Sequence, residues 1–221
     1  MIASMWSLLA ERRDFFAQLA LEHLAISGVA IAVALVLGGL FGGLMAEHQR
    51  MAKPSLALVN FLYTIPSISL LGFLIPFSGV GNVTAVITLT MYALLPMVRA
   101  TYTGLSNIDP TLIEAARGMG STDGQIMRRV KLPLALPYVM SGIRSMATMT
   151  IALAGIASFI GAGGLGVAIY RGITTNNAAM TMDGSLLTAL LALLVDMVLG
   201  FVERRVGMRG TKGRATNRRM A

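Results

Sequence analysis

Long apolar segments alternate with short charged ones along this chain. The segments long enough to cross about 30 Å of hydrocarbon as a helix are residues 21–46, 55–77, 83–105, 134–160 and 184–203. Residues 54–98 carry no charge and are too long for one span, so we expect the chain to reverse near residues 78–82. The pattern predicts an all-α, polytopic membrane protein with five transmembrane helices in a single domain, residues 1–221.

The composition excludes several classes of protein. Hydrophobic residues make up 55% and charged residues 13% of the 221 residues, whereas soluble domains carry about 25% charged residues. The chain has no cysteine and only two histidines, His23 and His48, which are too far apart to form a ligand pair at helical spacing. No P-loop motif occurs. We therefore expect no metal, no cofactor and no catalytic residue on this chain, and we expect a partner to hydrolyse any ATP.

The net charge of +8 is distributed unevenly. Seven of the 18 Lys and Arg residues follow Glu203. If the C-terminus is cytoplasmic, only Arg12, Arg13 and Arg171 lie outside, and such a bias sets membrane orientation. We expect the N-terminus outside, the C-terminus inside, a basic cytoplasmic tail at residues 204–221 and no nucleic-acid partner. The first apolar run exceeds a signal-peptide core, so no cleaved signal is expected.

Three ionisable residues inside the predicted spans suggest an ion pair. Asp196 lies about 10 Å of helix inward from Glu203, and an acid at such a depth is expected to be paired or to face water. Arg99 and Arg144 are near the inner ends of their spans, from which a long side chain can extend. We predict that Asp196 pairs with Arg99 or Arg144. A proton relay is the alternative, but it would need several acids.

Prolines interrupt the second and third spans. Pro66 and Pro76 lie in the second and Pro96 in the third, and each removes a backbone donor. Broken helices at membrane depth line a cavity or are buried in protein. Tyr63, Pro66 and Tyr92 are therefore candidate residues of a translocation path, with simple packing as the alternative role.

Two glycine-rich motifs need separate interpretations. Gly38, Gly39, Gly42 and Gly43 form overlapping G-x-x-x-G patterns that let another helix approach closely, within the chain or at a subunit interface.

Residues 161–166 match G-x-G-x-x-G, but a helix-length apolar run precedes them instead of a short strand. We predict a glycine-rich turn at the outer end of the fourth span and no dinucleotide site.

A polar loop, residues 106–133, separates the third and fourth spans. Asp109 before Pro110 is typical of a helix start, and a second short helix is expected from about Thr122. Two short amphipathic helices beside a membrane either dock into a cytosolic partner or lie at the membrane interface. The spacing alone leaves both possibilities open.

The same loop carries a motif of known type. Glu114-Ala115-Ala116, Gly120 and Val130-x-Leu132-Pro133 resemble, at matching spacing, the EAA loop in the membrane subunits of ABC importers. The resemblance to type I importer permeases covers about residues 21–205 and implies their five-span fold. In that family the loop helix sits in a groove of the ATPase, which its glutamate contacts. The resemblance therefore implies that the ATPase-coupling residues are Glu114, Ala115, Ala116, Gly120, Val130, Leu132 and Pro133.

Further segments are similar to permeases for glycine betaine, carnitine and choline, namely residues 60–67, 92–96, 101–104, 113–120 and 159–166. This resemblance implies an inner-membrane subunit that translocates a quaternary ammonium osmoprotectant. The implied partners are two copies of an ABC ATPase that bind ATP-Mg, a second permease copy or paralogue, and an extracytoplasmic substrate-binding protein. The alternatives are a permease for methionine or another amino acid and, less favoured, a channel or secondary transporter without an ATPase.

Overall fold

The computed structural model describes the backbone of residues 2–217 and the side chains of residues 4–205. No strand occurs in this part of the chain. The elements are α1 (Ile2–Glu11), α2 (Arg13–Glu47), α3 (Gln49–Thr64), α4 (Ser67–Ser78), α5 (Asn82–Ser106), α6 (Pro110–Gly118), α7 (Asp123–Ile126), a π-helical segment (Met127–Lys131), α8 (Leu132–Ala154), a 3₁₀ segment (Gly155–Ile160), α9 (Gly166–Thr174) and α10 (Ala178–Asn217).

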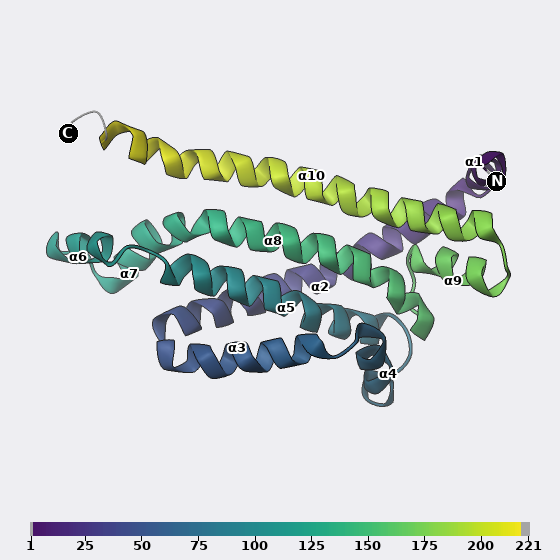
Figure 1. Cartoon of the computed structure of the whole chain (residues 1–221), viewed down its shortest axis with the longest axis horizontal. Helices are drawn as coiled ribbons and strands as arrows, with labels where there is room; N and C mark the ends of the chain where they lie inside the picture. Colours follow the sequence, from purple (N-terminus) through teal and green to yellow (C-terminus); the bar gives the residue numbers. More distant parts are fainter. Residues whose placement is uncertain (1, 218–221) are drawn as a thin grey trace.

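Helices α2, α5, α8 and α10 run along the body of the molecule, with α3 beside them (Figure 1). Helix α5 packs between α2 and α8, and α8 packs between α5 and α10. One of the core clusters, Ala34, Ala93, Met97 and Met146, joins α2, α5 and α8. Helices α6 and α7 lie at one end of this bundle, whereas α1 and α9 lie at the other.

Small residues allow the three central helices to approach closely. A Cβ atom added to Gly42 of α2 would lie 2.6 Å from the Cβ of Thr101 on α5. A Cβ added to Gly142 of α8 would overlap the Cβ of Ala100 on α5. Of the two roles left open for the G-x-x-x-G face, Gly42 therefore serves packing within the chain. Gly43, by contrast, has no atom within 4 Å of such a Cβ.

Among the described residues, four helical segments are long and apolar enough to cross a membrane, and the count reaches five if one bent pair forms a single span. The pair is α3 and α4, whose axes differ by 96° across Ile65 and Pro66. The predicted second span at residues 55–77 therefore contains a sharp break. Pro66 explains it, because proline disfavours helical geometry at Ile65 and cannot donate its own backbone hydrogen bond. The hydroxyl of Tyr92 donates a hydrogen bond to the Ile65 carbonyl at this break.

The turn at residues 161–165 is fastened to the bundle by polar side chains. Gly161 and Gly164 have φ of 75° and 94°, which glycine adopts without steric cost. The amide of Gly163 donates to Asn82 Oδ1 at 2.8 Å, and the amide of Gly164 donates to Glu22 Oε2 at 3.2 Å. This confirms the predicted glycine-rich turn, and it connects the turn to the first residues of α5 and to α2.

Candidate functional site

The start of α6, the first short helix of the predicted coupling loop, is set by Asp109 and Pro110. Asp109 caps α6, because its carboxylate accepts hydrogen bonds from the Thr111 amide at 2.9 Å and the Thr111 hydroxyl at 2.7 Å. These bonds favour the charged carboxylate and hold the pKa of Asp109 below its ordinary value. Pro110 occupies the first helical turn, where no amide donor is required. The helix therefore starts at Pro110, as the Asp-Pro pair predicts.

The spacing from Ala116 to Gly120 reflects how α6 ends. The amide of Met119 donates to the Ala115 carbonyl at 3.1 Å, and that of Ser121 donates to the Ala116 carbonyl at 3.1 Å. Between them, Gly120 has φ of 84°, a left-handed conformation that glycine tolerates best. A residue without a side chain at position 120 therefore lets the chain turn directly into α7.

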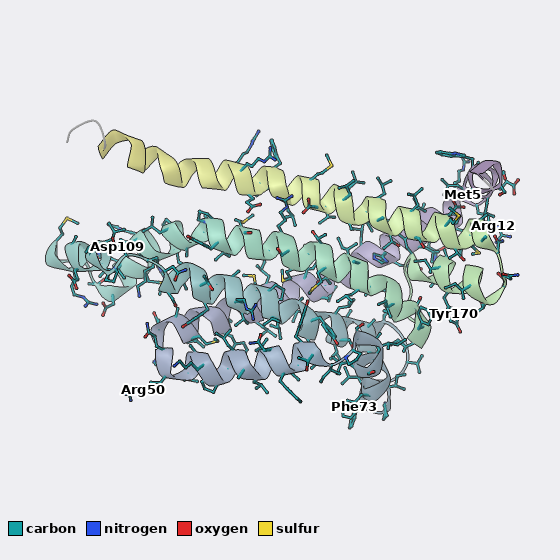
Figure 2. The ribbon with its side chains drawn as sticks, viewed as in Figure 1. Met5, Arg12, Arg50, Phe73, Asp109 and Tyr170 are labelled. Atoms are coloured by element: carbon teal, nitrogen blue, oxygen red, sulfur yellow. The ribbon has the colours of Figure 1, made fainter. Side chains whose placement is uncertain are left out.

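Helix α7 continues the loop and is joined to α6 by an ion pair. Thr122 and Gln125 form a reciprocal capping box, in which each side chain bonds to the backbone of the other residue. Arg117 Nη2 lies 2.8 Å from Asp123 Oδ1. Ile126 is buried. The two helices are thus joined to each other at the end of the bundle, where Figure 2 shows Asp109.

The residues of the EAA motif present mainly a free surface. Glu114 and Ala115 are exposed, whereas Ala116 is buried. Within the described residues, Glu114 has no hydrogen-bond or ion-pair partner. Val130 lies in the half-buried π-helical segment, and Leu132 and Pro133 begin α8 with exposed side chains. Leu112 and Met119 on the same loop are also exposed, at 47% and 80%. A charged group beside apolar side chains thus remains available for a partner.

The structure brings Arg144 and Asp196 together between α8 and α10, where both side chains are partly buried. Arg144 Nε and Nη2 each donate to one carboxylate oxygen of Asp196 at 2.6 Å, which is the bidentate geometry of strong charge-assisted pairs. Arg144 Nη1 also donates to Glu203 at 3.2 Å. Gly200 leaves space for the guanidinium, since an added Cβ would lie 3.1 Å from its Cζ. Arg144 therefore forms ion pairs with two acids of α10 and so joins α8 to α10.

Arg99, the other predicted partner of Asp196, lies elsewhere. Its Nη2 donates to Asn60 Oδ1 of α3 at 2.8 Å, and no carboxylate of the described residues lies within ion-pair distance of it. The side chain of Arg99 instead lines a cavity of about 440 Å³ among α3, α5 and α8. A second cavity of about 530 Å³ contains Arg144, Asp196 and Glu203.

The candidate path residues cluster at the break between α3 and α4. The rings of Tyr63 and Tyr92 have centroids 5.7 Å apart. Tyr63 is 42% exposed and its hydroxyl donates to Met149 Sδ at 3.0 Å, whereas Tyr92 is buried. Pro66 follows the carbonyl of Ile65 that Tyr92 binds. Of the three, only Tyr63 lines the cavity that contains Arg99.

Sequence reasoning missed several polar residues of the two cavities and the turn. Asn60 was not singled out, although it lies three residues before Tyr63 and thus on the same helical face. Glu203 was treated as the end of a span, yet it joins the Arg144 network. His23 was considered only as a metal ligand. It is fully buried, with Nε2 bonded to the Ile151 carbonyl at 2.9 Å and Nδ1 accepting from the Leu165 amide at 3.3 Å.

These features define a class of protein: a multi-pass helical membrane protein that exposes a short, capped helix between two spans. The comparison with known proteins makes the assignment specific. Residues 15–208 match the family described as "Binding-protein-dependent transport system inner membrane component", and the chain belongs to this family. It is an inner-membrane permease subunit of the type I ABC importer fold.

Named relatives are similar over most of their length. The glycine betaine/carnitine/choline transport system permease protein OpuCB of Bacillus subtilis is 36% identical over 192 residues, which cover 87% of this chain and 88% of the relative. The osmoprotectant import permease protein OsmW of Salmonella typhimurium is 40% identical over 194 residues, which cover 86% of this chain and 90% of the relative. A chain of the inward-facing MetNI methionine ABC transporter has a TM-score of 0.78 at 28% identity, with 89% of this chain and 98% of that chain covered.

Proposed function

We propose that this permease carries a quaternary ammonium osmoprotectant, such as glycine betaine, choline or carnitine, through an ATP-driven importer. The observation that carries the proposal is the similarity along nearly the whole chain to relatives named for these solutes, at 36% to 40% identity. The methionine transporter has a similar fold but only 28% identity. Methionine or another amino acid is therefore the alternative substrate.

The proposed complex couples ATP hydrolysis on partner subunits to movement of this chain. Two ATPase subunits bind ATP-Mg, and each permease inserts α6 into one of them through Glu114 and the adjoining alanines. Support comes from the exposed, capped α6 and from the ion pair that joins it to α7. Closure of the ATPase dimer on ATP moves α6 and α7 as a lever and switches the spans between two orientations. The second permease is a copy of this chain or a paralogue.

The proposed orientation places α6, α7 and the C-terminal end of α10 in the cytoplasm and the N-terminus outside. Figure 2 shows Arg50 and Asp109 at one end of the bundle and Arg12 and Tyr170 at the other. The end with α6 carries the larger share of lysine and arginine in the sequence, which supports this orientation. An extracytoplasmic binding protein would deliver the solute at the opposite end, and Tyr63, Pro66 and Tyr92 are proposed to lie along its path.

The test of the substrate is uptake of labelled glycine betaine at high osmolarity, in cells with and without this gene and without other betaine carriers. We expect uptake that depends on the gene and on ATP. Unlabelled choline, carnitine and proline betaine should compete, and methionine should not. Gene-dependent uptake of methionine without uptake of betaine would contradict the proposed substrate class.

The test of the coupling role is Glu114→Lys. We expect the variant to enter the membrane normally but to lose association with the ATPase and ATP-dependent uptake, because the substitution reverses an exposed charge on α6. Glu47→Lys is the matched control, since Glu47 is an exposed acid at the end of α2 outside the loop. Undiminished uptake by Glu114→Lys would show that α6 does not dock through this residue, and ATP-independent uptake would favour a channel.

A further inference from the structure

The cavity among α3, α5 and α8 contains a permanent positive charge that the protein does not neutralise. Arg99 is the only ionisable cation among its lining residues, and the other polar side chains there are hydroxyls. Among the described residues, its guanidinium bonds only to the neutral amide of Asn60. A guanidinium has five N–H donors, so most of those of Arg99, which is exposed, have no protein acceptor among the described residues.

The arginine of the second cavity, Arg144, differs from Arg99 because it is paired with acids of the same chain. There, Arg144 is bound by Asp196 through two hydrogen bonds and by Glu203 through a third. Charges inside a membrane bundle are costly unless they pair or face a water-filled cavity. Arg144 satisfies this requirement with protein acids. Arg99 satisfies it only if the cavity supplies an anion or water.

Aromatic faces lie beside this arginine. Tyr63 of α3 and Tyr138 of α8 both line the cavity, with exposed fractions of 42% and 52%. Tyr63 is one helical turn from Asn60, which holds Arg99. Its ring contacts that of Tyr92 at a centroid distance of 5.7 Å. A quaternary ammonium group has no N–H donor, and tyrosine faces attract such cations.

The structure thus assigns this cavity to a zwitterion that carries both a carboxylate and a quaternary ammonium group. The carboxylate binds the guanidinium of Arg99, and the ammonium group lies against Tyr63 and Tyr138. The volume of about 440 Å³ is within the range of small-molecule sites. This assignment rests on the proposed function and extends it. The permease itself then binds glycine betaine and carnitine more tightly than choline, which has no carboxylate to bind Arg99.

The absence of cysteine from the chain provides a direct binding assay. Ser145 is exposed and lines the cavity from α8, so Ser145→Cys introduces the only thiol of this subunit into the site. The full permease–ATPase complex carrying this change is labelled with a charged methanethiosulfonate, with glycine betaine or choline as protectant and without the binding protein. Ser7→Cys on α1, which is exposed and outside the cavity, is the control.

We expect glycine betaine to slow labelling of Ser145→Cys and not of Ser7→Cys. Adding Arg99→Gln should raise the betaine concentration for half-protection by about tenfold or more, since a charge-assisted bidentate pair is lost. Protection by choline should be weaker and should not depend on Arg99. Arg99→Lys keeps the charge without the planar fork and should give an intermediate value.

Three outcomes would overturn the assignment in distinguishable ways. If the complex imports betaine but betaine gives no protection, or protects equally with Arg99→Gln, the site is wrong while the proposed function stands. If the complex imports choline and no substrate with a carboxylate, the role of Arg99 is wrong. If it imports none of these solutes, the proposed function itself fails.

Discussion

Arg144 of α8 and Asp196 of α10 are bound through two parallel hydrogen bonds of 2.6 Å each, although 52 residues separate them in the chain. Glu203, two turns further along α10, binds the same guanidinium more weakly at 3.2 Å. Helix α10 is otherwise poorly buried in the bundle, since only 6% of its most apolar 18-residue segment is buried. The arginine therefore supplies a directional contact that the apolar surface of α10 does not.

Removing Asp196 alone should destabilise the subunit more than removing all three charges of this network. Asp196→Leu leaves the Arg144 guanidinium with only its weaker bond to Glu203, whereas the triple change Arg144→Leu/Asp196→Leu/Glu203→Gln leaves no unpaired ion among these three positions. We expect the single variant Asp196→Leu to have the lower thermal unfolding temperature in detergent. Glu203→Gln should lower that temperature by less than half as much as Asp196→Leu, because it weakens one long bond. A triple variant less stable than Asp196→Leu would contradict this account.

The neighbouring glycines Gly42 and Gly43 should respond oppositely to alanine. A Cβ at Gly42 would lie 2.6 Å from Thr101 Cβ and 2.8 Å from the Val98 carbonyl oxygen. Such overpacking costs about 1–3 kcal/mol, which outweighs the gain of about 1 kcal/mol from the better helix propensity of alanine. Gly43 has open space around it, so Gly43→Ala should be neutral or slightly stabilising. Unfolding of both variants in denaturant checks this. If Gly43→Ala instead disrupted the assembled complex, that side of α2 would be a subunit interface.

Local features of the coupling loop were predictable from the sequence because their causes lie within a few residues. Asp109 caps Pro110–Gly118, and Thr122 caps α7 through Gln125 three residues later. Each of these starts depends on a side chain bonding to a backbone amide in the next turn. The EAA motif adds Gly120, whose positive φ ends α6.

Contacts between helices were not predictable in the same way. The sequence allowed either Arg99 or Arg144 as the ion-pair partner of Asp196. Which arginine forms the pair depends on how each helix is rotated about its axis. Pro66 indicated an interruption, but neither the angle of 96° nor the bond from Tyr92 to the Ile65 carbonyl, 27 residues away, follows from spacing. The three-residue spacing of Asn60 and Tyr63 places both on one helical face, and this was the only hint in the sequence that Asn60 lies near the candidate path. The cavity around Arg99 arises only when α3, α5 and α8 pack together.

Acid should loosen the start of α6. Hydrogen bonds from Thr111 lower the pKa of Asp109, so the charged cap contributes stability above the unfolded pKa of about 3.8 and loses it as pH falls through the lower folded value. We expect the hydrogen-exchange protection factors of α6 to fall as the pH drops below about 4. Asp109→Asn caps without ionising and should remove this pH dependence. Identical pH profiles for the two proteins would show that the Asp109 charge does not hold α6.

The buried imidazole of His23 should matter for stability, whereas the second histidine should not. His23 bonds to the Ile151 carbonyl of α8 and to the Leu165 amide after the glycine-rich turn. His23→Phe retains a ring of similar shape but leaves that carbonyl and that amide without their partner. A buried polar group left unsatisfied costs about 1–3 kcal/mol, so the unfolding free energy should drop by at least this amount.

His48→Phe is the matched control for this prediction. His48 is exposed at the end of α2 and bonds only to the Leu44 carbonyl one turn before it. Its replacement should change the unfolding free energy by less than about 0.5 kcal/mol. The two variants should also differ in proteolysis of residues 161–165, because only His23→Phe removes one of the bonds that hold this turn to α2. Equal stability and equal proteolysis of the two variants would mean that Glu22 and Asn82 suffice to hold the turn.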